Sequence, residues 1–237
     1  METNEPKEKR LKLSTLESKY GTQKLTVIDD SIRKQVLEEM EAIELESSKD
    51  PFLTNETYRL FGVSSFSTKH KNLLCLRFDT CFHGHYFEIY YIFVKLLKRD
   101  KVVPKIVAHT LPSFLPLEEW ERECLSSDLQ TFTQCVSLHL NSFIARREQC
   151  KAVQAAYPSL ELTASMGYTH VSIAFEHFRL QLAYSADSRR PHSVEQTVSE
   201  AAESFPRAAR EQISLLSQHK SDFEHRDLLE VLSDWIL

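Results

Sequence analysis

The sequence predicts an α+β protein in which two antiparallel β-meanders, each covered by helices, are joined by one long helix. Three observations lead to this prediction. Apolar and polar side chains alternate in short segments between residues 58 and 111, which is the pattern of half-buried strands. Between Leu117 and Gln149 the apolar side chains recur at helical steps, and between residues 160 and 198 the alternation returns. A chain of 237 residues is long enough to bury two cores of this kind.

The composition is that of an ordinary globular protein, with 42% hydrophobic and 27% charged residues. A net charge of -5 with a pI near 6.1 argues against a general nucleic-acid-binding surface, so direct contact with DNA is not expected. No apolar run reaches the roughly 20 residues that span a bilayer, and charged residues rather than an apolar signal segment follow Met1. The five cysteines include no Cys-x-x-Cys pair, which predicts reduced, buried thiols and a cytosolic or nuclear location.

The chain begins with a charged arm, residues 1–28, which is predicted to be flexible. Helical spacing starts after three possible N-cap residues, Asp29, Asp30 and Ser31. The apolar face of this helix consists of Ile32, Val36, Met40 and Ile43. It is too short for a self-sufficient coiled coil, so we expect the helix to pack on the following sheet or on a partner.

Four strands are expected next, at residues 58–66, 73–82, 86–97 and 102–111. In the second strand Leu76 and Phe78 point to one face, with Arg77 and Asp79 on the other. The third strand is apolar on both faces and is therefore predicted to be central. The fourth contains Pro104, which removes one donor from the ladder and places this strand at the edge of the sheet. The short links make an antiparallel meander that needs helices on one face.

A long helix follows Pro112 and Pro116, which end the strands. It is expected to run for roughly 22 residues from Asp128 and to measure about 33 Å, enough to cross a small sheet. Its buried stripe is formed by residues at steps of three and four: Leu125, Leu129, Phe132, Val136, Leu140 and Phe143. The first domain is therefore expected to cover residues 29–154.

The second domain, residues 155–237, begins around the break at Tyr157-Pro158. Alternation predicts three short strands, at residues 160–164, 171–175 and 178–184. Residues 193–198 could add a fourth strand at the edge, after a polar loop, Ser185–His192, that is expected to be mobile. Pro206 suits the first position of a helix, since its missing donor costs nothing there. An apolar helix between His225 and Leu237 is predicted to be buried.

Apolar side chains on more than one side of two elements predict a partner chain. The strand at residues 86–97 is apolar on both faces, and the long helix carries large apolar side chains outside its main stripe. Such an element is either central in its own domain or shared with another chain. The residues expected at this interface are Phe87, Ile89, Tyr91, Phe93, Trp120, Leu138, Phe143 and Ile144.

The candidate nucleophile and metal ligands are better explained by packing and solvation. Cys124 has acidic neighbours, which make a thiolate less available, so it is expected to be packed rather than nucleophilic. His83 and His85 flank a turn without a third ligand nearby. Cys135 and His139 lie one helical turn apart without a second pair, so zinc is expected at neither position.

Other motifs of catalysis are equally weak. Glu118 and Glu119 diverge by about 100° on a helix, and carboxylates in a first turn favour the N-terminal dipole. The four glycines are too far apart for a phosphate-binding loop, and no Gly-x-Ser-x-Gly motif occurs. Basic residues cluster at positions 95–101 and 146–151, where a solvated turn and a helix C-terminus explain them. We therefore expect no catalytic residue, no metal and no cofactor.

Two neighbouring stretches together resemble the centromere protein O family of the inner kinetochore. They are FHGHYFEIYYIFVKLLKRDKVVPKIVAH and the following LPSFLPLEEWERECLSSDLQTFTQCVSLHLNSFIARREQC. The matching features are an F-x-G turn followed by Tyr-Phe, an aliphatic strand with a basic turn, and a histidine before the motif Pro112–Glu119. They also include a long helix that carries Leu140-Asn141 and Arg146-Arg147. The resemblance covers about Tyr58 to Val153.

The resemblance implies tandem RWD domains, each an antiparallel four-stranded sheet covered by helices on one side. It also implies a non-enzymatic scaffold subunit of the constitutive centromere-associated network, located in the nucleus at the centromere and kinetochore. The expected partners are a centromere protein P-like subunit in a heterodimer and further subunits of the Q, U and R type. Two alternatives remain open, an RWD adaptor in a ubiquitin or stress-kinase pathway and an enzyme that would use Cys124.

Overall fold

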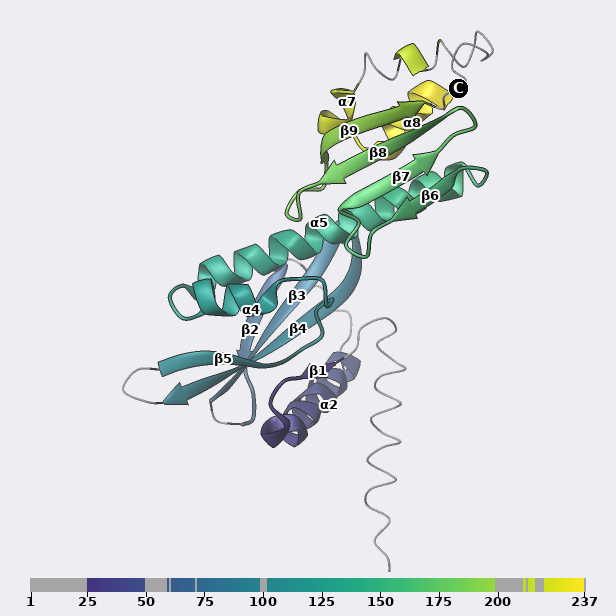
Figure 1. Cartoon of the computed structure of the whole chain (residues 1–237). Helices are drawn as coiled ribbons and strands as arrows, with labels where there is room; N and C mark the ends of the chain where they lie inside the picture. Colours follow the sequence, from purple (N-terminus) through teal and green to yellow (C-terminus); the bar gives the residue numbers. More distant parts are fainter. Residues whose placement is uncertain are drawn as a thin grey trace, which may run out of the picture. The chain divides into compact units, whose positions relative to one another are not determined.

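The structure is a computed structural model that describes residues 25–49, 59, 61–70, 72–98, 102–198, 211, 213–215 and 220–236 (Figure 1). Most of the expected charged arm and the helix expected at Pro206 lie outside these residues. The chain divides into two compact units. Unit 1 runs to Ser137 apart from residues 81–85, and unit 2 contains residues 81–85 and everything from Leu138 onwards. In the described part of the chain no helix has both the length and the apolar composition needed to cross a membrane.

Unit 1 is built on a sheet of five strands in the order β1-β5-β4-β3-β2. The strands are β1 (Thr26–Val27), β2 (Val63–Ser67), β3 (Leu73–Phe82), β4 (His85–Lys98) and β5 (Val102–His109). The predicted meander is therefore present, with β4 in the centre of the sheet as expected. β2 begins later than predicted because Gly62 has a φ of 69°, which interrupts an extended strand.

The expectation that the strand with Pro104 forms the edge of the sheet is wrong for the second half of β5. β1 pairs with β5 at Ala108 and His109. The N–H of Ile28 also donates to the carbonyl of Val107 at 2.8 Å. β1 does not reach Pro104, so the proline lies where β5 has a neighbouring strand on one side only.

Helices of the same chain cover both faces of this sheet. α2 (Arg33–Lys49) packs against one face through Val36 and Met40, which are buried together with Tyr91 and Phe93 of β4. Figure 1 shows α4 (Leu117–Trp120) and the start of α5 on the other side of the sheet. Of the two contacts expected for the first helix, the following sheet or a partner, the structure shows the sheet. The face for which a partner was expected is filled by α2.

Of the three expected N-cap residues, Asp29 has this role. It precedes η1 (Asp30–Ile32), a short 3-10 helix that leads into α2. Its carboxylate accepts the N–H of Ser31 at 3.0 Å and the hydroxyl of Ser31 at 2.6 Å. The hydrogen bond from the Ser31 hydroxyl is the main reason why the pKa of Asp29 is lowered.

The long helix α5 (Leu129–Ala156) has 28 residues, more than the roughly 22 expected, and is about 42 Å long. Asp128 caps its start, since its carboxylate accepts the N–H of Gln130 at 2.9 Å and the hydroxyl of Thr131. The bond from Thr131 lowers the pKa of Asp128. The predicted stripe is buried except for Leu129, which is 41% exposed.

Unit 2 contains a second antiparallel sheet in the order β6-β7-β8-β9. Its strands are β6 (Glu161–Ala164), β7 (His170–Ala174), β8 (Phe178–Tyr184) and β9 (Pro191–Val198). The three strands predicted from alternation and the fourth strand predicted at the edge are confirmed.

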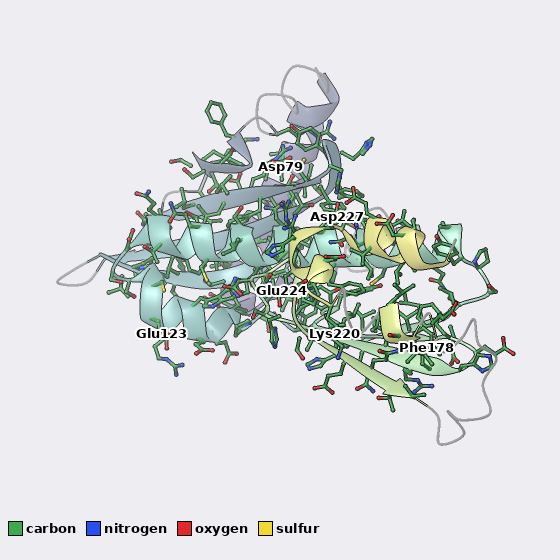
Figure 2. All side chains as sticks on the ribbon, turned by 90° about the horizontal axis from the view of Figure 1, so that it is seen from above. Asp79, Glu123, Phe178, Lys220, Glu224 and Asp227 are labelled. Atoms are coloured by element: carbon green, nitrogen blue, oxygen red, sulfur yellow. The ribbon has the colours of Figure 1, made fainter. Side chains whose placement is uncertain are left out.

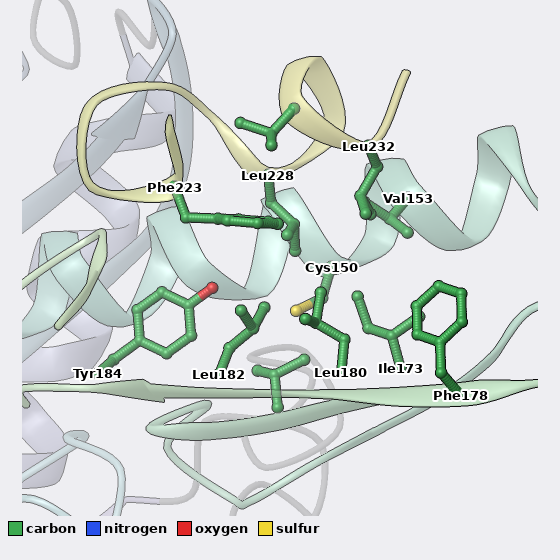
Figure 3. Close-up of a cluster of buried hydrophobic side chains, with 12 residues drawn as sticks. Cys150, Val153, Ile173, Phe178, Leu180, Leu182, Tyr184, Phe223, Leu228 and Leu232 are labelled. Atoms are coloured by element: carbon green, nitrogen blue, oxygen red, sulfur yellow. The ribbon is translucent and has the colours of Figure 1, made fainter. Parts of the chain in front are cut away.

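The core of unit 2 lies between this sheet and three helices (Figure 3). Side chains from β7 and β8 point towards α5, α7 (Asp222–His225) and α8 (Leu228–Ile236). The buried residues labelled there are Cys150, Val153, Ile173, Phe178, Leu180, Leu182, Tyr184, Phe223, Leu228 and Leu232. Each large apolar side chain buried in this way contributes about 1.5–3 kcal/mol. The predicted burial of the final helix is confirmed for Leu228 and Leu232, whereas the side chain of Trp235 lies outside the described residues.

Candidate partner-binding surface

A polar stripe on α5 holds the loop between β8 and β9. Ser142, Arg146 and Gln149 follow one another at steps of four and three, so they share one side of the helix, and all three are buried. The hydroxyl of Ser142 donates to the carbonyl of Asp187 at 2.7 Å. The side-chain amide of Gln149 donates to the carbonyl of Arg189 at 3.2 Å. The loop that was expected to be mobile is therefore tied to the helix by three buried side chains.

Arg146 makes most of these bonds. Its Nη1 donates to the carbonyls of Ser185 and Ala186 at 3.1 and 3.2 Å and to that of Ser188, and its Nη2 donates to the carbonyl of Gly167 at 3.1 Å. Burial lowers the pKa of Arg146 to about 10, so the guanidinium keeps its charge at neutral pH. The carbonyl dipoles compensate for the cost of burying that charge. The expectation that Arg146 lies at the C-terminal end of the long helix is wrong, because α5 continues to Ala156.

The turn between β3 and β4 also belongs to unit 2. His83 and Gly84 have φ values of 50° and 75°, both positive, as in a two-residue type I′ hairpin. The N–H of Cys81 donates to Oδ1 of Asn141 at 3.0 Å, and Nε2 of His83 lies 2.6 Å from Oδ2 of Asp227. Asp227 comes from the segment that carries α7 and the start of α8 (Figure 2). One of the two histidines considered as metal ligands thus contacts a carboxylate in this unit.

A groove of about 800 Å³ lies among these parts of unit 2. Its apolar lining includes Phe82, Leu138 and Pro191, and its polar lining includes Arg189 and Glu224. Leu138 is 52% exposed and lies in the middle of α5. An exposed apolar anchor in a concave surface with charged residues around it is typical of protein-binding sites.

Of the eight residues expected at an interface, the structure leaves Leu138 exposed. Five are buried within the chain itself: Tyr91, Phe93, Trp120, Phe143 and Ile144. Phe87 and Ile89 are half-buried, and Ile89 packs against the core under α2. Burial in the isolated chain explains the apolar character of the five, so Leu138 is the exposed member of this set.

The free thiols are buried or half-buried. Burial raises the pKa of the Cys75 thiol, and it raises that of Cys150 to about 12, so neither forms a thiolate at neutral pH. Cys124 is half-buried in η2 (Glu121–Leu125), and its carbonyl accepts the N–H of Asp128 at 2.8 Å. Among the described residues, no group of three or more His, Cys, Asp or Glu side chains is arranged to hold a metal ion.

The acidic residues that follow β5 belong to unit 1 and have different environments. Glu118 and Glu119 are exposed in α4. The carboxylate of Glu121 accepts the N–H of Ile106 at 2.7 Å and so satisfies a backbone donor of β5. Glu121 therefore links the helical turn to the sheet.

The two basic clusters are partly neutralised by neighbouring carboxylates. In the α5 cluster Glu148 lies 2.7 Å from Nε of Arg147 and 2.8 Å from Nζ of Lys151. In the hairpin cluster Nζ of Lys95 lies 3.8 Å from Asp29. The other side chains of the hairpin cluster, at positions 98, 99 and 101, lie outside the described residues.

The chain is similar to known proteins. A family model described as Cenp-O kinetochore centromere component matches residues 57–227. Centromere protein O of Gallus gallus is 30% identical over 99 residues, which cover 42% of this chain and 29% of that protein. The Xenopus tropicalis protein is 31% identical over 100 residues, 42% of this chain and 31% of that protein. The Homo sapiens protein is 27% identical over 127 residues, 52% of this chain and 39% of that protein. The chain spans less than two fifths of the length of these relatives.

Proposed function

The chain belongs to the centromere protein O family, and from this premise we propose that it is a non-enzymatic structural subunit of the inner kinetochore. The family match carries the proposal, because residues 57–227 include β2 to β5, α5 and the whole second sheet. Family members are centromere components, so the chain acts in the nucleus at the centromere and kinetochore. Its proposed task is to pair with a centromere protein P-like subunit, to join subunits of the Q, U and R type, and to support kinetochore assembly and chromosome segregation.

We propose that the chain folds as two RWD-like domains, residues 29–154 and 155–237. The observation in favour is that β2 to β5 and β6 to β9 are each four strands paired in chain order. Helices pack against both sheets. Unit 1 adds β1 at the edge of its sheet and α2 on a second face.

The groove around Leu138 is proposed as the contact for the partner subunit. Leu138 is half exposed and lies on α5, next to a loop that Arg146 binds through its carbonyls. A site whose loops are already ordered loses little entropy on binding. Complete burial of the leucine by a partner would add about 1 kcal/mol to the affinity.

The decisive experiment is a fluorescent tag on the full chain in dividing cells. Constant puncta at centromeres are expected, together with co-purification of a centromere protein P-like chain at equal stoichiometry. A diffuse signal, with a ubiquitin ligase or a stress kinase as the main co-purified protein, would contradict the proposal and favour an adaptor role.

A Leu138→Asp substitution is expected to weaken partner binding at least tenfold, since it would bury an unpaired carboxylate in the interface. Leu129→Asp is the matched control, because Leu129 is exposed on the same helix but does not line the groove. Both variants should unfold at the same urea concentration as the parent. Equal partner binding by the two variants would exclude the groove as the contact.

A further inference from the structure

One edge strand lacks the features that normally prevent strands from pairing with other chains. The two sheets end in β1, β2, β6 and β9. β1 has only two residues, β6 carries Glu161, and β9 begins with Pro191 and carries Glu195. Short length, charge and proline all protect an edge against strand addition. β2, with the sequence Val-Ser-Ser-Phe-Ser, carries neither charge nor proline.

The bonds at the two ends of β2 show which of its backbone groups face β3. The N–H of Asp79 donates to the carbonyl of Gly62 at 2.7 Å, and the N–H of Thr68 donates to the carbonyl of Leu73 at 3.2 Å. In an antiparallel ladder, bonded residue pairs alternate with non-bonded pairs. The even-numbered residues from 62 to 68 are therefore the ones that bond to β3.

The odd-numbered residues of β2 direct their backbone groups to the open side. Val63, Ser65 and Ser67 each present one N–H and one carbonyl there. Ser65 and Ser67 are exposed. Within the described residues, no other strand pairs with this side of β2.

We propose that β2 pairs antiparallel with β2 of a second copy of this chain, around a two-fold axis at Ser65. Ser65 then lies opposite Ser65 of the other copy, and Val63 lies opposite Ser67. Each copy donates from the N–H groups of these residues and accepts at their carbonyls, so the pairing uses about six hydrogen bonds. An isologous contact of this kind closes after two copies and gives a dimer rather than a filament.

The side chains of β2 fit a second copy better than a charged strand of another protein. A strand that meets its own copy places like charges near each other, which is destabilising, but β2 has none. The same two-fold relation brings Phe61 of one copy to the end where Lys69 of the other lies. Phe61 is 75% exposed and Lys69 is exposed, so an aromatic ring and a cation are both accessible at this end. The contact does not depend on a kinetochore partner.

Sedimentation velocity of the purified full chain over a concentration series tests this inference. The parent is expected to show a monomer–dimer equilibrium. Ser65→Pro removes a donor that faces the open side and leaves the bonds to β3, so it should fold and weaken the dimer by about tenfold or more. Ser65→Ala keeps the N–H and is the matched control, which should dimerise like the parent.

Amide hydrogen exchange of the parent locates the contact by a second route. The N–H groups of Val63, Ser65 and Ser67 should gain protection as the concentration rises, whereas those of Ser64 and Phe66 should be protected at all concentrations. This measurement decides the matter even if the proline variant does not fold. A parent that is monomeric throughout, or a dimer without new protection at the three odd-numbered residues, would overturn the inference.

Discussion

At the scale of single residues, two buried arginines show different ways of keeping a charge inside a protein. Arg77 forms two bonds of 2.8 Å with the carboxylate of Asp79, two positions along β3. Arg146 bonds to backbone carbonyls from the β8–β9 loop and to the carbonyl of Gly167. Both side chains are almost completely buried. Arg77 therefore fixes the position of another side chain, while Arg146 determines the path of a loop.

Replacing Arg146 by Met is expected to reduce the free energy of unfolding by about 2–4 kcal/mol, because the carbonyls of Ser185, Ala186, Ser188 and Gly167 lose a charged donor. Urea unfolding followed by circular dichroism measures this difference. Lys151→Met is the control, since Lys151 is exposed and its ion pair with Glu148 is worth less than about 1 kcal/mol. If the Arg146 variant loses no more unfolding free energy than the Lys151 variant, the β8–β9 loop does not depend on these bonds.

At the scale of elements, sequence patterns predict the helices and strands that are determined by residues close to one another in the chain. Alternation continues without interruption through β3, and the structure has this strand at the expected limits, Leu73–Phe82. The pattern contains no sign of β1, since two residues cannot show a period, and its pairing with β5 is a long-range contact. The attachment of the loop Ser185–His192 to α5 was not predicted for a similar reason. Its acceptors are backbone carbonyls, which every residue has, so the loop sequence does not reveal them. The polar spacing of Ser142, Arg146 and Gln149 was the available signal.

The sequence also could not decide what covers the second face of the first sheet. An apolar strand face is the same whether a helix of the same chain or a partner buries it. The structure places α2 there, and Tyr91 and Phe93, two of the expected interface residues, are core residues beneath it. Leu138, by contrast, is apolar and exposed. It could be distinguished from the buried members of the expected set only once the faces of α5 were known.

Met40→Ala tests whether α2 covers this face in the isolated chain. Met40 is 2% exposed, and its truncation should cost about 2–4 kcal/mol of unfolding free energy through lost burial and a cavity. Leu129→Ala, at a position 41% exposed, should cost less than about 1 kcal/mol. Chemical unfolding of the purified chain without any partner supplies both values. A Met40 variant as stable as the parent would mean that α2 does not pack on the sheet in solution.

At the scale of the whole molecule, charge is the property that limits the choice of partners. The chain carries 34 acidic and 29 basic residues, a net charge of -5 at pH 7. Of the basic residues near the end of α5, Arg146 is buried, and Arg147 and Lys151 share Glu148. Binding to duplex DNA draws most of its affinity from neutralised phosphates, which needs several exposed cations close together. The cations near the end of α5 therefore leave little uncompensated positive charge for a phosphate backbone.

The purified chain is accordingly expected to bind a random-sequence DNA duplex with a dissociation constant weaker than about 10⁻⁴ M at physiological salt, the weak end of non-specific binding. Fluorescence anisotropy of a labelled duplex measures this. A double variant, Arg147→Glu with Lys151→Glu, should give the same flat titration as the parent, because these two cations are already compensated by Glu148. Micromolar binding by the parent that weakens steeply with salt and disappears in the double variant would contradict the prediction. In that case α5 would carry a DNA contact, and the role of the chain would extend from joining protein subunits to holding the centromeric duplex.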